Sequence, residues 1–274
     1  MIYKFITNNP ELARYAVSCG VQRIFVDMEY LGKEARQGHI DSHKARHTLT
    51  DLGNVRKAVP DAELMVRINP VHERTPAEVA DVLKAGVDVV MLPMFTSAEE
   101  VAKAGALISG SARFSLLLET PQALTRLDEI LELQDMIDEV HVGLNDLHLG
   151  LGLDFMFEVL SGGLVDVIAG KVHKAGIRFG FGGVARAGEG AVPAELVLGE
   201  HVRLGSEMVI LSRTFHQNAR SVDELKSKID LRKEIEKLDA CLTGFKKGDK
   251  SLLEDNRQQL IAAVRSVVRE KAIA

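Results

Sequence analysis

Two carboxylates stand directly after short apolar runs of the sequence. Glu119 ends the run FSLLLE, and Asp146 closes the stretch EVHVGLND. If the two runs are neighbouring parallel strands, their ends lie about 4.8 Å apart, so the carboxylates repel each other or share a proton or a cation. Oxygen ligands without a thiol or histidine cluster suit a hard ion. We therefore predict a Mg²⁺ or Mn²⁺ site on Glu119 and Asp146, completed by water and substrate.

The alternative is that each carboxylate caps the helix that follows it. Thr120 and Pro121, directly after Glu119, are typical of a helix start and support this alternative.

Further polar residues occupy equivalent positions after other apolar runs. Arg67 ends the run LMVR and needs an anionic partner. It either pairs with Glu29 or Glu119 as a structural bridge, or holds a substrate carboxylate or a developing oxyanion. His148 lies two residues after Asp146 and is either an acid or base of the site or a surface residue. The candidate substrate-binding residues are Arg67, Pro93, Met94, Leu144, Asn145 and Asp146.

Three histidines, His39, His43 and His47, lie four residues apart in the stretch GHIDSHKARHTL. On a single helix this spacing permits a zinc site. Because the stretch is rich in Lys and Arg, a solvated helix face is the favoured interpretation.

One pattern recurs along the chain and indicates how these residues are positioned. A helix ends in a small residue and Gly, and a β-branched run follows, in SCGVQRIFVD, KAGVDVVMLP, KAGIRFGFGG and RLGSEMVILS. Glycine adopts the left-handed conformation that ends a helix, and the apolar run is typical of a strand buried on both faces. The chain therefore alternates helices and parallel strands.

This alternation predicts an α/β fold, a TIM (β/α)8 barrel over residues 1–217. The competing open doubly wound sheet needs a glycine-rich loop after the first strand, which FITNNPEL does not supply. The predicted strands are Tyr3–Thr7, Arg23–Glu29, Glu63–Asn69, Val87–Pro93, Arg113–Glu119, Glu139–Leu144, Arg178–Val184 and Glu207–Ser212. The predicted helices are Pro10–Cys19, Ser42–Ala58, Pro76–Ala85, Ala98–Ile108, Pro121–Leu133, Asp154–Ala175 and Val192–Leu204.

Residues 218–274 form a C-terminal helical segment dense in charge. Its first amphipathic helix is expected to be the eighth barrel helix, and its second exceeds what a barrel needs. The apolar stripe of the second helix is buried either against a neighbouring subunit, as an oligomerisation helix, or against its own barrel.

Composition excludes several classes of protein. A net charge of −5 argues against binding of nucleic acid or of an anionic membrane, and three Tyr with no Trp argue against a base-stacking surface. No run of 18 apolar residues and no signal-like N-terminal segment occur, and the two cysteines are far apart. We therefore expect a cytoplasmic protein without disulfides.

The motifs VDME (26–29), VRINP (66–70), MLPM (91–94), LLLET (116–120) and GLNDLHLGLG (143–152) follow one another in a familiar order. Together they resemble the HpcH/HpaI aldolase and citrate lyase β-subunit family of phosphoenolpyruvate/pyruvate-binding TIM barrels. The resemblance implies a divalent metal, usually Mg²⁺, on Glu119 and Asp146 that binds a 2-oxo acid, with Arg67 stabilising the oxygen that becomes negative. It also implies a homo-oligomer, a trimer or hexamer, with C-terminal helices at the subunit contacts.

The sequence departs from this family at one position. Aldolases of the family carry a histidine base directly after the D-x-E motif, where this chain has Tyr30, and acyl-CoA lyases carry an acid there. The candidate catalytic residues are Arg67, Glu29, Tyr30 and His148. The function expected is a metal-dependent carbon–carbon lyase or aldolase acting on a small 2-oxo acid. The alternatives are an acyl-CoA lyase of the citrate lyase β or malyl-CoA type, and a non-catalytic barrel that binds 2-oxo acids.

Overall fold

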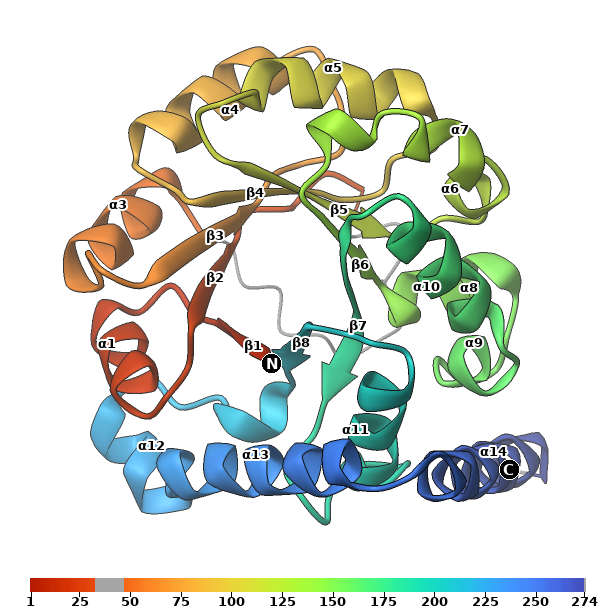
Figure 1. The fold of residues 1–274 in the computed structure, drawn as a ribbon. Helices are drawn as coiled ribbons and strands as arrows, with labels where there is room; N and C mark the ends of the chain where they lie inside the picture. Colours follow the sequence, from red (N-terminus) through yellow and green to blue (C-terminus); the bar gives the residue numbers. More distant parts are fainter. Residues whose placement is uncertain (33–46, 274) are drawn as a thin grey trace.

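The strands of the chain close into a barrel (Figure 1). In the computed structural model, which describes residues 1–32 and 47–273, eight parallel strands follow one another around the ring in sequence order, and β8 pairs with β1. This confirms the predicted TIM-barrel fold. The strands are β1 Ile2–Ile6, β2 Arg23–Asp27, β3 Glu63–Arg67, β4 Val89–Leu92, β5 Arg113–Leu118, β6 Glu139–Val142, β7 Arg178–Val184 and β8 Met208–Leu211.

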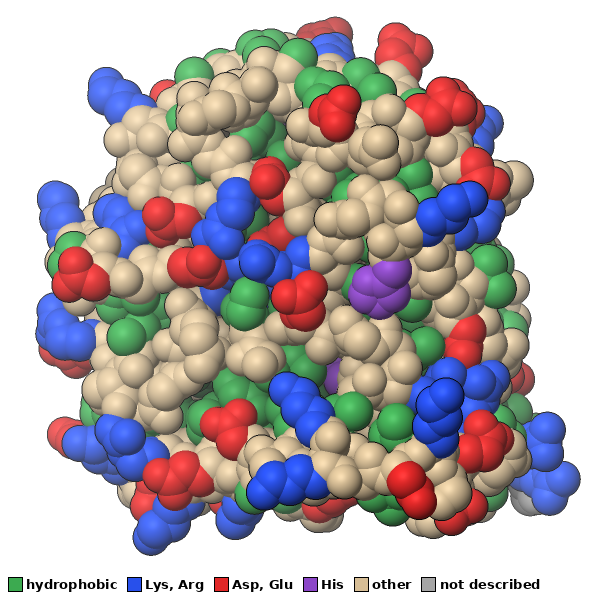
Figure 2. Space-filling view, viewed as in Figure 1, with side chains coloured by type: hydrophobic (Ala, Val, Ile, Leu, Met, Phe, Trp, Pro, Cys, Tyr) green, Lys and Arg blue, Asp and Glu red, His purple; other side chains and the backbone are tan. Residues whose placement is uncertain are grey.

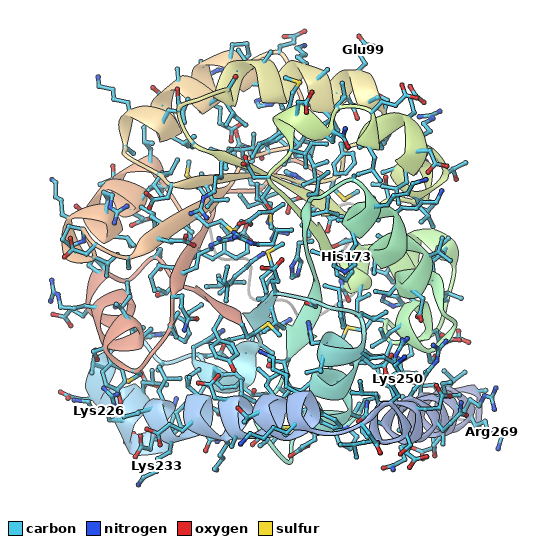
Figure 3. All side chains as sticks on the ribbon, in the orientation of Figure 1. Glu99, His173, Lys226, Lys233, Lys250 and Arg269 are labelled. Carbon is cyan, nitrogen blue, oxygen red and sulfur yellow. The ribbon has the colours of Figure 1, made fainter. Side chains whose placement is uncertain are left out.

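Helices surround the strands, and their apolar faces form one core with the outward faces of the sheet. Figure 3 shows side chains filling the space between the two layers, while Lys226, Lys233 and Arg269 point outward. The helices described are α1 Pro10–Ser18, α3 Leu49–Ala58, α4 Thr75–Lys84, α5 Ala98–Ile108, α6 Pro121–Thr125, α7 Leu127–Leu131, α8 Leu144–Leu151, α9 Glu158–Ser161, α10 Leu164–Lys174, α11 Ala194–Arg203, α12 Val222–Lys228, α13 Leu231–Lys247 and α14 Lys250–Ile273.

The segment after β6 differs from the prediction of one long helix over Asp154–Ala175. Helix α8 already begins at Leu144, which we had assigned to the strand, and it ends at Gly152 with φ +71°. A second left-handed glycine, Gly163 with φ +82°, separates α9 from α10. Because glycine adopts this conformation at little cost, these residues divide the segment into three helices.

Two other predicted helices are shorter than expected. The helix predicted over Ser42–Ala58 begins at Leu49, because Thr48 and Asp51 form a reciprocal capping box at its start. Residues 42–46, with His39 and His43, lie outside the described part of the chain. His47 precedes the cap and so does not lie on a helix face. The helix predicted over Pro121–Leu133 divides at Arg126 into α6 and α7.

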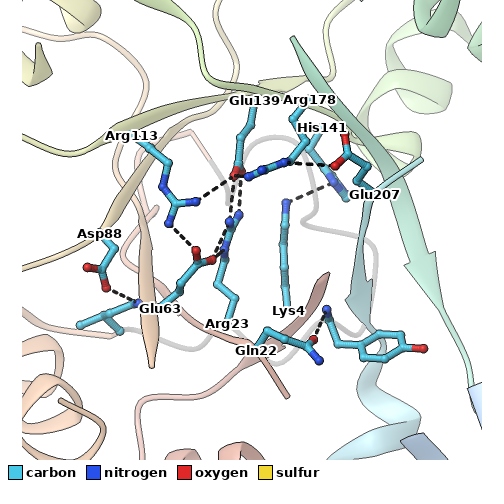
Figure 4. A network of polar contacts seen from close by, with 12 residues as sticks. Lys4, Gln22, Arg23, Glu63, Asp88, Arg113, Glu139, His141, Arg178 and Glu207 are labelled. Carbon is cyan, nitrogen blue, oxygen red and sulfur yellow. Dashed lines mark hydrogen bonds and ion pairs between the residues drawn. The ribbon is translucent and has the colours of Figure 1, made fainter. Parts of the chain in front are cut away.

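Charged side chains fill the end of the barrel at which the strands begin. Arg23 is fully buried and donates to both carboxylate oxygens of Glu139, at 2.6 and 2.8 Å, and to Glu63 at 2.8 Å. Arg113 and Arg178 reach the same acids from neighbouring strands (Figure 4). Figure 2 shows acidic and basic side chains gathered at the centre of this face. The buried charges are tolerated because each one is paired.

The C-terminal segment packs on its own barrel. Helix α13 takes the place of the eighth barrel helix, beside α11, and Tyr3 donates to Asp239 at 2.7 Å. Helix α14 buries Leu260 and Val264, and Asn256 donates to the Leu196 carbonyl of α11 at 3.0 Å. The centre of the apolar stripe of α14 is therefore buried within the chain, while Leu252 at its start is 41% exposed, and the homo-oligomer stays a prediction.

The first prediction concerns the Arg23–Glu139 pair. Glu139→Gln should lower the free energy of unfolding by about 3–5 kcal/mol, because it removes the buried carboxylate and leaves the guanidinium of Arg23 with only the partly exposed Glu63 as its partner. Burial raises the pKa of Glu139, but the hydrogen bonds and charge of Arg23 outweigh burial and lower it to about 2 from 4.5. The pair therefore stabilises the fold fully above pH 4.5, and this contribution is lost as the pH falls toward 2. Denaturant unfolding at several pH values measures both effects.

The matched control is Glu207→Gln, because that carboxylate contacts Arg178 at 3.5 Å but its side chain is 56% exposed. Its effect should stay below about 1 kcal/mol. Equal losses for the two variants would contradict a special role of the buried pair.

The second prediction concerns the docking of α14. A Cβ on Gly199 would lie 2.3 Å from Nδ2 of Asn256, so Gly199→Ala should displace α14 and destabilise the protein by about 1–3 kcal/mol. On α10, a Cβ on Gly170 meets no atom within 4 Å, and Gly170→Ala should stabilise by about 0.5–1 kcal/mol. Thermal unfolding of both variants decides the matter, and stabilisation by Gly199→Ala would show that α14 is not seated as described.

Candidate functional site

A cavity of about 790 Å³ opens at the end of the barrel where the strands finish. Its walls come from the ends of β1, β2, β3, β5, β6, β7 and β8 and from the segments that follow them. The predicted residues Arg67, Glu119, Leu144, Asn145 and Asp146 all line it. Residues far apart in the sequence therefore meet here because parallel strands all end at the same side.

Glu119 directly follows β5 and is only 3% exposed. Its Oε1 accepts a hydrogen bond from the backbone N–H of Met94 at 3.2 Å. Met94 has φ +54°, an unfavourable value for a residue with a side chain, so the backbone is strained where it contacts the carboxylate. Thr120, not Glu119, caps α6 through a hydrogen bond from the Ala123 N–H at 3.1 Å. The capping alternative is therefore wrong for Glu119.

Asp146 lies in the first turn of α8 and is partly exposed. Burial, together with the negative charges of Asp146 and Glu29, raises the pKa of Glu119 well above its usual value. The charge of Arg67 and the Met94 N–H act in the opposite direction. The negative charge of Asp146 therefore disfavours ionisation of Glu119, and a cation shared by the two carboxylates stays a prediction.

Gly143 links β6 to α8 and leaves the space in which the Glu119 carboxylate lies. A Cβ at this position would be 2.7 Å from Oε2 and 2.8 Å from Cβ of Glu119. Gly143 is also the N-cap of α8 and offers no side chain to cap the helix. Within residues 1–32 and 47–273, the N-cap position therefore gives no side-chain hydrogen bond to the first turn of α8, which includes Asn145, and the N–H groups of this turn suit an anionic ligand.

Arg67 is held by two acids from the end of β2. Its Nε and Nη2 donate to the two oxygens of Asp27 at 2.8 and 2.7 Å, and its Nη1 lies 3.4 Å from Oε2 of Glu29. The sequence had suggested Glu29 or Glu119 as the partner, and the main partner is Asp27. The two-point contact fixes the plane of the guanidinium while Arg67 still lines the cavity.

His141 of β6 connects the cavity to the barrel interior. Its Nε2 lies 2.9 Å from the Gly182 carbonyl, which fixes the proton on Nε2 and leaves Nδ1 to accept from Nζ of Lys4 at 3.3 Å. Burial, then the charge of Lys4, lowers the pKa of His141 well below its usual value. Burial likewise lowers the pKa of Lys4 to about 7. A neutral imidazole thus anchors the carbonyl of Gly182, where the register of β7 and β8 shifts.

His47 also lines the cavity, although the sequence favoured a solvated helix face for it. Its Nδ1 accepts a hydrogen bond from the backbone N–H of Asp27 at 2.9 Å. With Nδ1 occupied as an acceptor, the neutral ring carries its proton on Nε2. No periodic signal in the sequence pointed to this placement, because His47 and Thr48, directly before α3, are not helical.

Other predicted site residues lie away from the cavity wall. Tyr30 is 61% exposed, and its backbone N–H donates to Asn69 at 3.0 Å. His148 lies on the buried face of α8, and its Nδ1 has no partner in the described structure. Pro93 is buried, and Met94 contributes its backbone. The catalytic roles of Glu29, Tyr30 and His148 and the substrate-binding role of Pro93 stay predictions.

The donor set fits a hard divalent cation. The charge of Asp146 repels that of the buried Glu119 carboxylate. A cation bound by both carboxylates would stabilise their ionised forms. The space that Gly143 leaves beside Oε2 of Glu119 would be filled by any larger residue. Among the residues described, no group of three or more His, Cys, Asp or Glu side chains forms a complete protein cage.

Among the described residues, no helix has the length and hydropathy that a membrane span requires.

Comparison with known proteins confirms the resemblance seen in the sequence. The solved structure of an HpcH/HpaI aldolase from Desulfitobacterium hafniense DCB-2 is 19% identical with a TM-score of 0.59, and the match covers 77% of this chain and 85% of that one. An HpcH/HpaI aldolase/citrate lyase family protein from Burkholderia cenocepacia J2315 is 16% identical, TM-score 0.61, covering 87% and 93%. The citrate synthase SbnG is 16% identical, TM-score 0.58, covering 90% and 93%.

The comparison with curated proteins finds no significant match. At these sequence identities the solved structures show a shared fold. The family model for HpcH/HpaI aldolase/citrate lyase, however, matches residues 5–158, which is more than half of the chain. The protein therefore belongs to the HpcH/HpaI aldolase/citrate lyase family.

Proposed function

We propose that this protein is a Mg²⁺- or Mn²⁺-dependent lyase or aldolase that forms or cleaves a carbon–carbon bond beside the enolate of a small 2-oxo acid. Family membership supports a carbon–carbon lyase activity in general. The observation that carries the finer proposal is the meeting of Glu119, Asp146 and Arg67 at one cavity. A non-catalytic binding barrel has no need of this combination.

Each residue of the chain has a defined task in this proposal. Glu119 and Asp146 would hold the cation, which when bound polarises the 2-oxo group and makes the adjacent C–H more acidic. Arg67, oriented by Asp27, stabilises the oxygen that becomes negative. The first-turn N–H groups of α8, including that of Asn145, receive the substrate carboxylate.

The apolar wall of the cavity keeps water away from the reacting carbon. Leu117, Leu144 and Met156 line it close to the residues that carry charge. Excluding water strengthens the electrostatic interactions of Arg67 and protects a reactive carbanion from protonation at the wrong step.

The third prediction tests enolisation directly. With Mg²⁺ or Mn²⁺ and pyruvate in D₂O, the protein should exchange the methyl protons of pyruvate, which NMR follows. Glu119→Gln and Asp146→Asn should each reduce the exchange rate at least about 100-fold, and a chelator should abolish exchange. Asp128→Asn is the control, because that side chain is 79% exposed and pairs with Lys171 on the surface. If both Glu119→Gln and Asp146→Asn exchange the methyl protons at the normal rate, these two residues do not hold the metal. If the unmodified protein shows no exchange, the proposed function is wrong.

The fourth prediction tests the space beside Glu119. Gly143→Ala should push the carboxylate aside and weaken Mg²⁺ binding at least about tenfold, as titration calorimetry without substrate can measure. A Cβ on Gly53 of α3 meets no atom within 4 Å, so Gly53→Ala should bind Mg²⁺ normally. Unchanged affinity in Gly143→Ala would mean that Glu119 is not a ligand.

The acyl-CoA lyase remains the runner-up within the same chemistry. It differs in the carbon nucleophile: the enolate forms from an acyl-CoA thioester, and the 2-oxo acid is the electrophile that the enolate attacks. The exchange assay, run in parallel with pyruvate and with acetyl-CoA, separates the two, because each class should exchange the protons of its own enolisable substrate.

A further inference from the structure

The acidic side chains that line the cavity lie on one side of it, together with Arg67, which pairs with Asp27. The acidic lining residues of the cavity are Asp27, which ends β2, and Glu119 and Asp146, which follow β5 and β6. Its other side is formed by the segment after β8, where Arg213 and Arg220 line the cavity and no described lining residue is acidic. Because β8 pairs with β7 and β1, this segment is not adjacent to the strand that carries Glu119.

The cavity is also larger than one small oxo acid requires. A three-carbon 2-oxo acid fills roughly 100 Å³, about the volume of three or four waters in the liquid. Of the 790 Å³ present, most therefore remains for a second reactant. The basic segment is the part of the wall that such a reactant would meet beyond the predicted metal site.

The backbone of this segment is strained but firmly held. Gln217 and Asn218 have φ values of +50° and +53°, and two consecutive left-handed residues with side chains cost about 1–3 kcal/mol each. Lys228 donates to the Gln217 carbonyl at 3.1 Å, and Asn9 donates to the Arg220 carbonyl at 3.0 Å. The surrounding structure thus enforces a turn that places Asn218 and Arg220 on the cavity.

His216 presents a hydrogen-bond donor on the same wall. Its ring packs edge-on against Phe5, and its Nδ1 accepts from the Asn218 N–H at 3.2 Å, which leaves the proton on Nε2. Burial, then the charge of Arg213, lowers the pKa of His216, so the ring is neutral near pH 7. It donates without adding a positive charge.

Arg220 keeps its guanidinium for a ligand. Its backbone N–H, not its side chain, donates to Glu224 at 2.9 Å, and the Glu224 carboxylate pairs with Lys228 at 2.7 Å. Within the described ranges 1–32 and 47–273, the guanidinium of Arg220 enters no ion pair. An exposed arginine that lines the same cavity as a neutral histidine donor suits a carboxylate or phosphate oxygen.

We propose that residues 212–220 form a second, anion-binding subsite, which holds the carboxylate or phosphate of an aldehyde that reacts with the enolate. The proposal rests on the proposed lyase function. In the condensing direction, C3 of the 2-oxo acid loses a proton and bonds to the aldehyde carbon, and the aldehyde oxygen takes up a proton. The anionic group is unchanged in the reaction and only positions the aldehyde. Cleavage is the reverse, so no further reactant is needed.

The experiment compares matched aldehydes with pyruvate and Mg²⁺. Glyoxylate is paired with neutral glycolaldehyde, and glyceraldehyde 3-phosphate with neutral glyceraldehyde, so that the two pairs distinguish carboxylate from phosphate. In the unmodified protein, kcat/KM should favour the anionic member of at least one pair. Arg220→Ala should reduce that preference about tenfold, mainly through KM, and Arg220→Lys should restore part of it. Arg265→Ala, an exposed arginine on α14, is the control.

Each outcome decides the matter. A preference that Arg220→Ala leaves intact, or no preference in the unmodified protein, overturns the subsite while pyruvate exchange still supports the proposed function. If exchange itself is absent, calorimetry with inorganic phosphate and with malonate tests the subsite alone. Binding of either anion that Arg220→Ala weakens about tenfold supports it, and no such difference overturns it.

Discussion

The site depends on a carboxylate that is buried where burial is unfavourable. Glu119 is nearly inaccessible to water, and two further acids, Asp146 and Glu29, repel its charge. Arg67 and the Met94 N–H offset only part of this cost, since the pKa of Glu119 remains well above its usual value. A cation between Glu119 and Asp146 would relieve the repulsion. The strained Met94 and the glycine at 143 both serve to keep this carboxylate in place.

The barrel interior is arranged in layers of different polarity. A paired network around Arg23 and Glu139 fills one end, and the cavity with its own charges occupies the other. Apolar side chains lie between them: Phe25, Met65, Val89, Met91 and Leu117. Lys4 donates to His141, and His141 donates to the Gly182 carbonyl, which ties the backbone near Gly182 to the barrel interior.

Much of the site was predictable from particular residues. Glu119, Asp146 and Arg67 end or follow apolar runs, and parallel strands bring such positions together in any barrel. We predicted Glu29 or Glu119 as the partner of Arg67 and not Asp27, because strand position alone does not show which carboxylate the guanidinium reaches. His47 was assigned to a helix face because its spacing from the other histidines matched a helical turn, whereas the capping box at Thr48 begins the helix after it.

The sequence by itself determined the fold class, the strand order and the three charged residues on which the proposed chemistry rests, because hydrophobic periodicity and helix-ending glycines are local signals. Only the tertiary structure decided which acid holds Arg67, where α14 is buried and which basic residues face the cavity. These depend on contacts between segments far apart in the chain, such as Asn256 with Leu196 and Asn9 with Arg220. Local sequence patterns carry no information on such contacts until the barrel has closed.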